Sequence, residues 1–220
     1  YTVADKTFER MATLAAQLDL SIHVHLHETR GEIEQGVAKH GVRPLQRLAR
    51  LGLLGPNLIG VHAVHLDDNE INLLAENGCA VAHCPTSNMK LASGTAPIAK
   101  LAGRGVRVGL GTDGAASNNR LDLFQEMRHA GLLAKAATGN AAVLSAHELL
   151  RMATLNGAAA LGMEGTIGSI QAGKAADLCA IRLDTLETSP CFDPASHLVY
   201  AAGREHVSHV WVNGALQVEN

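Results

Sequence analysis

The sequence predicts an α/β fold made of four strand–helix units, followed by two longer helices and a small β module. Four short apolar segments with strand character alternate with helical segments, which is the pattern of parallel strands joined by crossover helices. Polar residues, most of them histidines, stand at or just after the carboxyl ends of these segments. Active sites of (β/α) barrels are built at that face. A doubly wound sheet would show the same alternation of strands and helices. Because of the polar strand ends, we expect half of an eight-stranded barrel instead.

The strands and helices of the four units follow from periodicity and from residues that begin or end helices. Strand character spans 21–28, 58–65, 79–83 and 106–111. Helical spacing spans 7–18, 31–51, 68–76 and 96–104. Gly41 and Pro44 divide the second of these helices into two pieces, and Asp67 is a suitable N-cap for the third. The chain opens on a helix with no strand before it, so we expect it to be a piece of a longer protein.

The remainder predicts two longer helices, at 122–137 and 145–161, and then a β module. Ser145 followed by Glu148 is a capping-box pattern at the start of the second helix. Beyond it, Gly, Pro and Asp turns separate short strand-like segments at 178–183, 197–202 and 207–212. We expect the domains to be a partial barrel, 1–163, and a β module, 164–220.

Composition excludes several classes of protein. Of the 220 residues, 47% are hydrophobic and 18% charged, which suits a packed core and rules out wholesale disorder. The net charge of −3 implies no basic face for nucleic acid or a membrane surface. No apolar stretch reaches the roughly 18–20 residues that a bilayer span needs. The cysteines form no CxxC pair, which favours a reduced, cytoplasmic protein; they are Cys79, Cys84, Cys179 and Cys191.

The first group of candidate site residues follows the first strand. His23, His25 and His27 alternate along it, so we expect them to share one face of the sheet. Only the histidine nearest the mouth suits a ligand, and His25 is followed three residues later by Glu28. A neutral imidazole binds zinc or iron well, and a carboxylate beside it can move protons. For His23 and His27, an ordinary hydrogen-bonded place in the core or at the rim is the stronger expectation.

The next two strands also end in histidine. His62 closes the second strand, at a position where a buried strand usually has an apolar or small residue. His65 is expected to be a supporting or loop histidine. His83 closes the third strand and either contacts a substrate or supports its neighbours. For Cys84, which follows it, a small packed side chain is a stronger expectation than a nucleophile or a ligand.

The fourth strand ends in Gly-Thr-Asp-Gly, with Asp113 as a lone acid. A buried acid is costly unless it is paired or bound to a metal. His25, His62 and Asp113 come from three different strands, and Glu28 is nearby. Imidazole and carboxylate together bind a divalent metal and activate water, and three such residues at strand ends are less easily explained by chance than one. The sequence thus predicts a metal site at this rim.

Five stretches resemble the amidohydrolase superfamily. Within it they are most similar to the branch of methylthioadenosine and S-adenosylhomocysteine deaminases, close to the TRZ/ATZ chlorohydrolase group. The resemblance extends over essentially the whole chain, and its two longest strings, around the third and fourth strands, are specific. The stretches are HVHLHET at 23–29, HAVH at 62–65, HCPTSNMKLASG at 83–94, LGTDGAASNN at 110–119 and IGSIQAGKAADL at 167–178.

The resemblance implies a C-terminal half barrel, a C-terminal part of the family's composite β-sandwich domain, and hydrolytic deamination of an adenosine-type thioether nucleoside. Water replaces the amino group at C6, and ammonia leaves. His25 would be the metal ligand of the fifth barrel strand, and Asp113 both a ligand and the general base. His62 would orient the attacking water and approach the metal, while Glu28 would pass a proton to the purine ring. His83 would join Glu28 and Asp113 in contacting the substrate. The metal implied is one divalent ion, zinc or alternatively iron.

One departure from the family pattern is large. The paired histidines of the family's first strand have no counterpart before His23. We therefore expect this chain to be an incomplete piece of a deaminase, with metal binding and activity weak or absent on its own. The first and fourth strands would be open edges, which favours coverage by the other half of the protein or by a second copy.

Two alternatives remain open from the sequence. The chain resembles guanine deaminases, other heterocycle deaminases and chlorohydrolases through the same residues, so these cannot decide the substrate. A non-catalytic, metal-free scaffold is the alternative of another class. Retention of Glu28, His62 and Asp113 argues against the scaffold, because a scaffold has no use for a buried proton-relay set.

Overall fold

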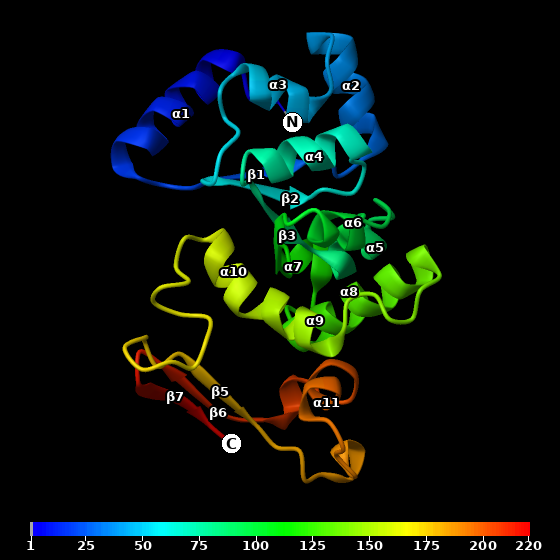
Figure 1. Ribbon diagram of the computed structural model, residues 1–220, viewed down its shortest axis with the longest axis vertical. Helices are drawn as coiled ribbons and strands as arrows, with labels where there is room; N and C mark the ends of the chain where they lie inside the picture. Colours follow the sequence, from blue (N-terminus) through cyan, green and yellow to red (C-terminus); the bar gives the residue numbers. More distant parts are fainter. Residues whose placement is uncertain (1) are drawn as a thin grey trace.

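The computed structural model describes residues 2–220 and contains a four-stranded, fully parallel sheet (Figure 1). Its strands lie side by side in chain order, β1-β2-β3-β4. Leu26 pairs with His62 and His83 with Leu110, so the carboxyl ends of neighbouring strands lie level. The predicted α/β fold with a parallel sheet is confirmed. The bounds are β1 Ile22–Leu26, β2 Leu58–His62, β3 Ala80–His83 and β4 Arg107–Leu110.

Helices connect the strands as the parallel arrangement requires. Gly41, with φ 71°, ends one helix and Pro44 begins the next, so the predicted division is confirmed. Asp67 caps its helix and forms a capping box with Glu70. The helices are α1 Asp5–Leu18, α2 Arg30–His40, α3 Pro44–Arg50, α4 Asp68–Glu76, α5 Pro85–Lys90 and α6 Ile98–Gly103.

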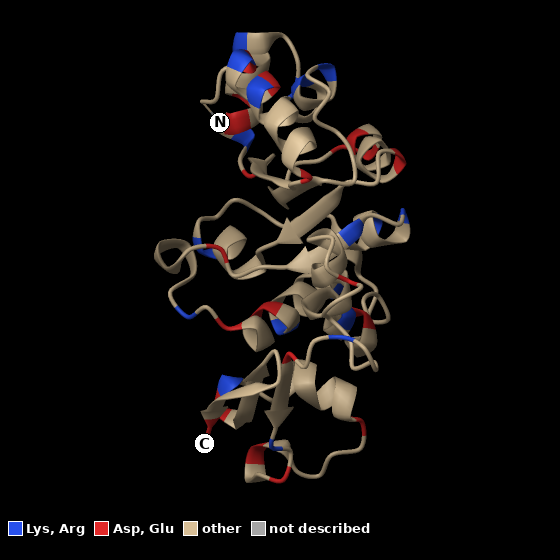
Figure 2. Ribbon diagram, turned by 90° about the vertical axis from the view of Figure 1, so that its left-hand side faces the viewer, with Lys and Arg blue, Asp and Glu red and all other residues tan. Residues whose placement is uncertain are grey.

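The main core lies between the sheet and the helices that cover it. Leu45, Leu74, Leu101 and Leu149 are each 0% exposed, and they come from four different helices. Full burial of a leucine contributes about 1.5–3 kcal/mol. The strands carry almost no charge, whereas Lys and Arg are interspersed with Asp and Glu on the outer helices (Figure 2). The core therefore holds the carboxyl ends of the strands in place.

The region after the sheet differs from the prediction at one point. Residues 145–161 were expected to form one helix, but α9 Ala146–Ala153 and α10 Leu155–Ala160 are separated at Thr154, with φ −128° and ψ −97°. The turn lets Gly157 of α10 approach Gly109 of β4 so closely that a Cβ on Gly109 would lie 3.0 Å from the Gly157 Cα. The expected single helix is wrong because close packing on β4 outweighs helical continuity. The other helices here are α7 Ala115–Asn118 and α8 Leu123–Thr138.

A three-stranded antiparallel sheet, ordered β5-β6-β7, lies near the C-terminus (Figure 1). The strand expected at 197–202 is wrong, because these residues lie in α11 and just beyond it. Asp193 accepts hydrogen bonds from the backbone N–H groups of Ala195 and Ser196, and Pro194 occupies the first turn, so the helix is capped where hydropathy alone indicated a strand. The bounds are β5 Leu178–Ile181, η1 Leu186–Thr188, α11 Pro194–Tyr200, η2 Arg204–His206, β6 Val207–Val212 and β7 Ala215–Glu219.

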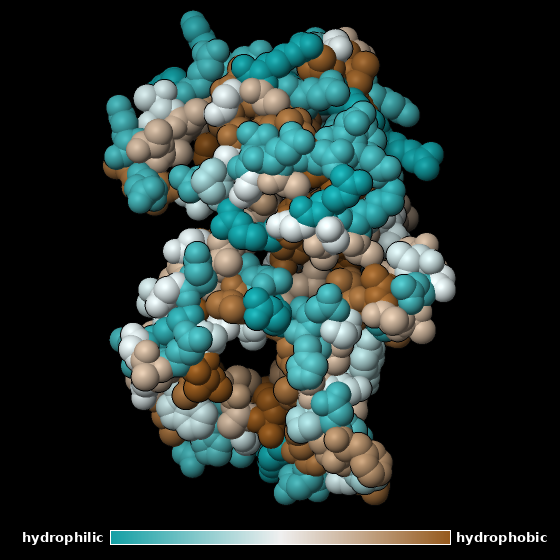
Figure 3. Space-filling view, in the orientation of Figure 1, coloured by the Kyte–Doolittle hydropathy of each residue, from teal (hydrophilic) through white to brown (hydrophobic). Residues whose placement is uncertain are grey.

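The strand β7 was not expected from the sequence, although Asn213-Gly214 is a hairpin signal. Both residues have positive φ, 49° and 78°, and they join β6 to β7. The surface is hollowed between the part with the parallel sheet and the three-stranded sheet (Figure 3). All four cysteines are free thiols. Within residues 2–220, no helix combines the length and apolar character needed to cross a bilayer.

Candidate active site

Three of the predicted site residues meet at the carboxyl ends of the strands. His25 lies in β1, His62 ends β2, and Asp113 follows β4. One potential ligand atom from each residue lies within 4.8 Å of the other two. The rings of His25 and His62 are stacked, with centroids 5.4 Å apart and an interplanar angle of 19°. The predicted convergence of these three side chains is thus observed.

The backbone turns sharply where it leaves the strands. His62 has φ 73° and Asp113 has φ 59°, a left-handed conformation that costs a non-glycine residue about 1–3 kcal/mol. Hydrogen bonds beyond the strand ends hold it, since the Ala63 N–H donates to the Leu26 carbonyl and the Gly111 N–H to the His83 carbonyl. Such strain is typical of functional sites.

The side chain of His62 is only 1% exposed and has a polar partner at each ring nitrogen. Its Nδ1 lies 2.8 Å from Asn88 Oδ1. An amide oxygen only accepts, so Nδ1 carries the proton and donates. The other ring nitrogen, Nε2, lies 3.8 Å from Glu28 Oε2. Nε2 is thus the ring nitrogen that lies on the side of Glu28.

Asp113 is held by two serines. The Ser87 and Ser117 hydroxyls donate to Asp113 Oδ2 at 2.7 and 2.6 Å. Partial burial by itself would raise the pKa of Asp113, but the hydrogen bonds from Ser117 and Ser87 outweigh it and hold the pKa below its usual value. The carboxylate is therefore ionised at neutral pH.

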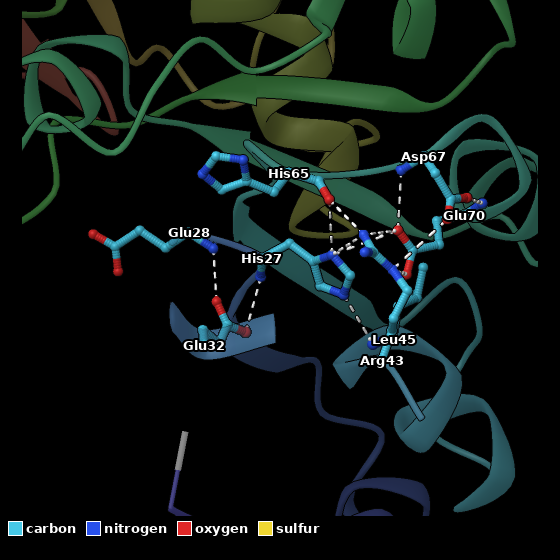
Figure 4. A network of polar contacts seen from close by, with 8 residues as sticks. All are labelled: His27, Glu28, Glu32, Arg43, Leu45, His65, Asp67 and Glu70. Carbon is cyan, nitrogen blue, oxygen red and sulfur yellow. Dashed lines mark hydrogen bonds and ion pairs between the residues drawn. The ribbon is translucent and has the colours of Figure 1, made fainter. Parts of the chain in front are cut away.

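Glu28 is positioned by a second glutamate on α2. The backbone N–H groups of His27 and Glu28 donate to Glu32 Oε1 and Oε2 at 3.0 and 2.7 Å (Figure 4). Glu32 in turn donates its backbone N–H to Thr29, the N-cap of α2. The loop after β1 is thus anchored to the first turn of the helix, and the Glu28 side chain, 12% exposed, extends away from that anchor (Figure 4).

The expectation that His27 shares a face with His23 and His25 is wrong. His27 has φ 53°, so its ring leaves the alternation of the strand and is 0% exposed. The Leu45 N–H donates to Nε2 at 3.1 Å, and Nδ1 donates to the His65 carbonyl at 3.2 Å (Figure 4). Burial lowers the pKa of His27, so the ring is neutral. The expected hydrogen-bonded place in the core therefore holds for His27.

His65 and His23 lie outside the cluster. His65 Nε2 contacts the Ser93 carbonyl at 2.8 Å and ties the loop after β2 to the loop after α5, a connecting role of the kind expected for it. His23 lies on an exposed part of β1.

His83 is buried beside the cluster. It is 1% exposed, and neither ring nitrogen has a hydrogen-bond partner among the described residues. Burial, with His62 close by, lowers the pKa of His83 to about 3, so the ring is neutral. An unsatisfied buried polar group costs about 1–3 kcal/mol. Cys84, by contrast, is packed and 2% exposed; burial raises the pKa of its thiol to about 12, so the side chain is a neutral thiol.

A cavity of about 370 Å³ lies beside β1. Its wall includes His25 and Glu28 but neither His62 nor Asp113. The cavity is also lined by residues of α1, α2 and α3. It therefore adjoins the cluster on one side without enclosing it.

Sequence reasoning assigned no role to Ser87, Asn88 and Ser117, although all three lie in the two specific strings quoted above. The signal was present, because each follows a strand end in a short helix. What the sequence could not supply was the partner of each hydroxyl or amide, which lies 26 residues away for Ser87 and Asn88.

Comparison with known proteins identifies the family. Residues 1–216 match the amidohydrolase family. A 5-methylthioadenosine/S-adenosylhomocysteine deaminase from Teredinibacter turnerae is 49% identical over 220 residues, which are 100% of this chain and 50% of that protein. The chain spans about half the length of the curated relatives it matches.

Solved structures are similar over the same extent. The crystal structure of an adenosine deaminase from Xanthomonas campestris with bound zinc has a TM-score of 0.98 and 51% identity, covering 100% of this chain and 50% of that chain. An atrazine chlorohydrolase from Arthrobacter aurescens complexed with zinc has a TM-score of 0.93 and 34% identity, covering 99% and 48%. On these matches, the chain belongs to the amidohydrolase family.

Proposed function

We propose that the chain forms the C-terminal half of a (β/α)8 barrel, 1–163, followed by part of a composite β-sandwich domain, 164–220. Four consecutive parallel strands in chain order support the half barrel. The chain also matches about half of longer relatives at high TM-score. The separate antiparallel sheet β5-β6-β7 supports the second domain.

The cluster of His25, His62 and Asp113 fits one divalent ion, for which zinc is the candidate and iron the alternative. Two imidazoles and an ionised carboxylate are a donor set that zinc accepts. Their potential ligand atoms lie within 4.8 Å of one another. Zinc–ligand bonds of roughly 2.0–2.2 Å call for a slightly tighter cluster, so we expect weak binding by this chain alone. When bound, such an ion acts as a Lewis acid and lowers the pKa of water.

The reaction we propose is hydrolytic deamination of an adenosine-type thioether nucleoside, methylthioadenosine or S-adenosylhomocysteine. The observation that carries it is the meeting of Asp113, His62 and Glu28 at one rim. Asp113, kept ionised by Ser87 and Ser117, accepts a proton from the attacking water. His62 orients that water. The water oxygen bonds to C6, the C6–N bond breaks, and ammonia leaves.

Two further residues act on the purine. Glu28, whose carboxylate lies 3.8 Å from His62 Nε2, takes one proton of the attacking water and passes it to the ring nitrogen as charge develops there, while the proton taken up by Asp113 goes to the leaving amino group. His83, with two ring nitrogens that lack partners in the described chain, contacts the polar edge of the substrate. The thioether substrates are favoured over guanine or triazines because the relative from Teredinibacter turnerae is named for them.

The rim at the carboxyl ends of the strands can accept a substrate, and the edge strands β1 and β4 can accept a partner. We propose that the chain pairs with the missing N-terminal half of the protein or with a second copy, in the cytoplasm. Apolar side chains on or just after α1 support a covered face, since they are 39–56% exposed: Met11, Leu14, Leu18 and Leu20.

The test is ammonia release by the chain co-expressed with the remaining half of the Teredinibacter turnerae relative. We expect ammonia from methylthioadenosine and S-adenosylhomocysteine, about one zinc or iron per complex, and loss of both in Asp113→Asn. Asp184→Asn, at an exposed position, is the matched control and should change neither.

Other outcomes separate the alternatives. Ammonia from guanine alone, or dechlorination of atrazine alone, would replace the substrate. A stable complex that holds no metal and acts on none of these compounds would favour the scaffold.

A further inference from the structure

Two adjacent residues of α5 contact two different members of the cluster. Ser87 is 0% and Asn88 1% exposed, although both follow β3, which contributes no member of the cluster. Ser87 donates to Asp113, and Asn88 accepts from His62. The third strand thus reaches the site through the short helix that follows it.

The Asn88 contact decides which nitrogen of His62 carries the proton. Because Asn88 Oδ1 accepts from Nδ1 at 2.8 Å, the tautomer selected in the neutral form of the ring has its proton on Nδ1 and its lone pair on Nε2. Only an unprotonated nitrogen can bind a metal. The amide therefore selects the ring form that the cluster requires.

The Ser87 contact decides the orientation of Asp113. Ser87 and Ser117 approach the same oxygen, Oδ2, from α5 and α7. Two donors on one oxygen fix the rotation of the carboxylate plane. The side chain of an aspartate with φ 59° is thereby prevented from turning away from the cluster.

A buried carboxylate holds α5 and α7 together. Glu126 of α8 is 0% exposed and accepts from the Thr86 N–H at 3.1 Å and from Asn118 Nδ2 at 2.7 Å. Thr86 and Asn118 precede and follow the two serines directly in sequence. Since Glu126 joins both segments, the spacing between Ser87 and Ser117 is set by a residue outside the site.

We propose that Ser87 and Asn88 act as one positioning unit, which fixes the tautomer of His62 and the orientation of Asp113 for metal binding. The proposal rests on the metal site proposed above. Outer contacts of this kind typically contribute 10- to 100-fold to metal affinity. The strings SNMKLASG and GTDGAASNN then carry the supports of the site as well as Asp113 itself.

The first experiment measures the tautomer without metal or substrate. Two-bond ¹H–¹⁵N spectra of the imidazoles in the chain should show His62 protonated on Nδ1. Asn88→Ala should shift His62 toward the other tautomer or a mixture, and Asn88→Asp, which keeps an acceptor, should restore the original pattern. Asn77→Ala, which removes an amide contact at the end of α4, should leave the His62 signals unchanged.

The second experiment measures binding of Zn²⁺ alone by competition with a chelating dye. Asn88→Ala and Ser87→Ala should each weaken affinity about 10- to 100-fold, with Ser87→Thr and Asn88→Asp recovering most of it and Asn77→Ala changing it less than about threefold. Circular dichroism establishes folding, and Ser87→Ala, which removes one oxygen, serves if Asn88→Ala does not fold.

The outcomes distinguish this proposal from the metal site. Zinc binding that neither Ser87→Ala nor Asn88→Ala changes overturns the positioning unit and leaves the metal site standing. A tautomer unchanged in folded Asn88→Ala also overturns it. A tautomer that follows the Asn88 acceptor in a chain that binds no zinc supports the His62 half of the unit and overturns the metal site.

Discussion

Arg43 and Glu70 form a two-bond ion pair beside the ring of His27, with Nε–Oε1 and Nη2–Oε2 distances of 2.8 Å (Figure 4). Glu70 is 1% exposed and accepts the backbone N–H of Asp67 as part of the capping box. Arg43 also donates to the His65 carbonyl at 2.6 Å. The pair thus joins α3, the start of α4 and the loop after β2 at one buried point.

Breaking this pair is expected to destabilise the fold. Glu70→Gln removes the charge that compensates Arg43 and weakens the capping box. We expect a loss of about 2–4 kcal/mol, at or below the roughly 3–5 kcal/mol of fully buried pairs because the Arg43 side chain is 27% exposed. Urea unfolding measures it. The control is Asp68→Asn, whose pair with Lys100 is exposed and should contribute little to stability. Equal losses in both variants would contradict the expectation.

Glu28→Gln should separate proton transfer from metal binding. Glu28 lies near His62 but is not one of the three clustered ligands. We expect deamination by the co-expressed complex to fall about 10²- to 10⁴-fold, while zinc affinity changes less than about threefold. Ammonia release and zinc competition measure the two effects. A variant that loses zinc and activity in parallel would mean that Glu28 acts as a ligand instead.

The capping box of α9 predicts a pH-dependent contribution to stability. Hydrogen bonds from the Ser145 hydroxyl and backbone N–H lower the pKa of Glu148 from its ordinary 4.5. A lowered pKa stabilises the fold above the ordinary value, and the contribution is lost as the pH falls through the lowered value. At pH 6, the free energy of unfolding of the wild type should therefore exceed that of Glu148→Gln by about 0.5–1 kcal/mol. The difference should shrink below about pH 4.5, as urea unfolding at several pH values will measure. A difference independent of pH would show that the carboxylate charge is not involved.

Gly109→Ala should disturb the contact between β4 and α10. The new Cβ would lie 3.0 Å from the Cα of Gly157, and backbone cannot yield as a flexible side chain can. We expect a loss of about 1–3 kcal/mol. Gly103→Ala, in α6 with nothing within 4 Å of the new Cβ, should be neutral or stabilising by up to about 1 kcal/mol. Thermal unfolding compares the two, and a neutral Gly109→Ala would mean that α10 moves freely on the sheet.

Much of the fold could be predicted from local patterns in the sequence. Strand β3 and helix α4 lie within a residue of their expected bounds, because alternating apolar residues, N-caps and Gly or Pro breaks act over a few residues. The meeting of His25, His62 and Asp113 was also accessible, since parallel strands in chain order bring their carboxyl ends to one rim. Pattern failed where long-range packing competes with it, as at Thr154 and in α11.

By itself, the sequence determined the parallel α/β sheet, the rim at which chemistry-bearing side chains collect, and the resemblance to the amidohydrolases. Only the tertiary structure decided which histidine enters the core and what orients the cluster. His27 turns inward because its backbone is left-handed and its partners, Leu45 and His65, come from other segments. Ser87 and Asn88 reach Asp113 and His62 across 26 residues of chain. Short-range periodicity carries no information about such contacts, because they exist only once the strands are packed side by side.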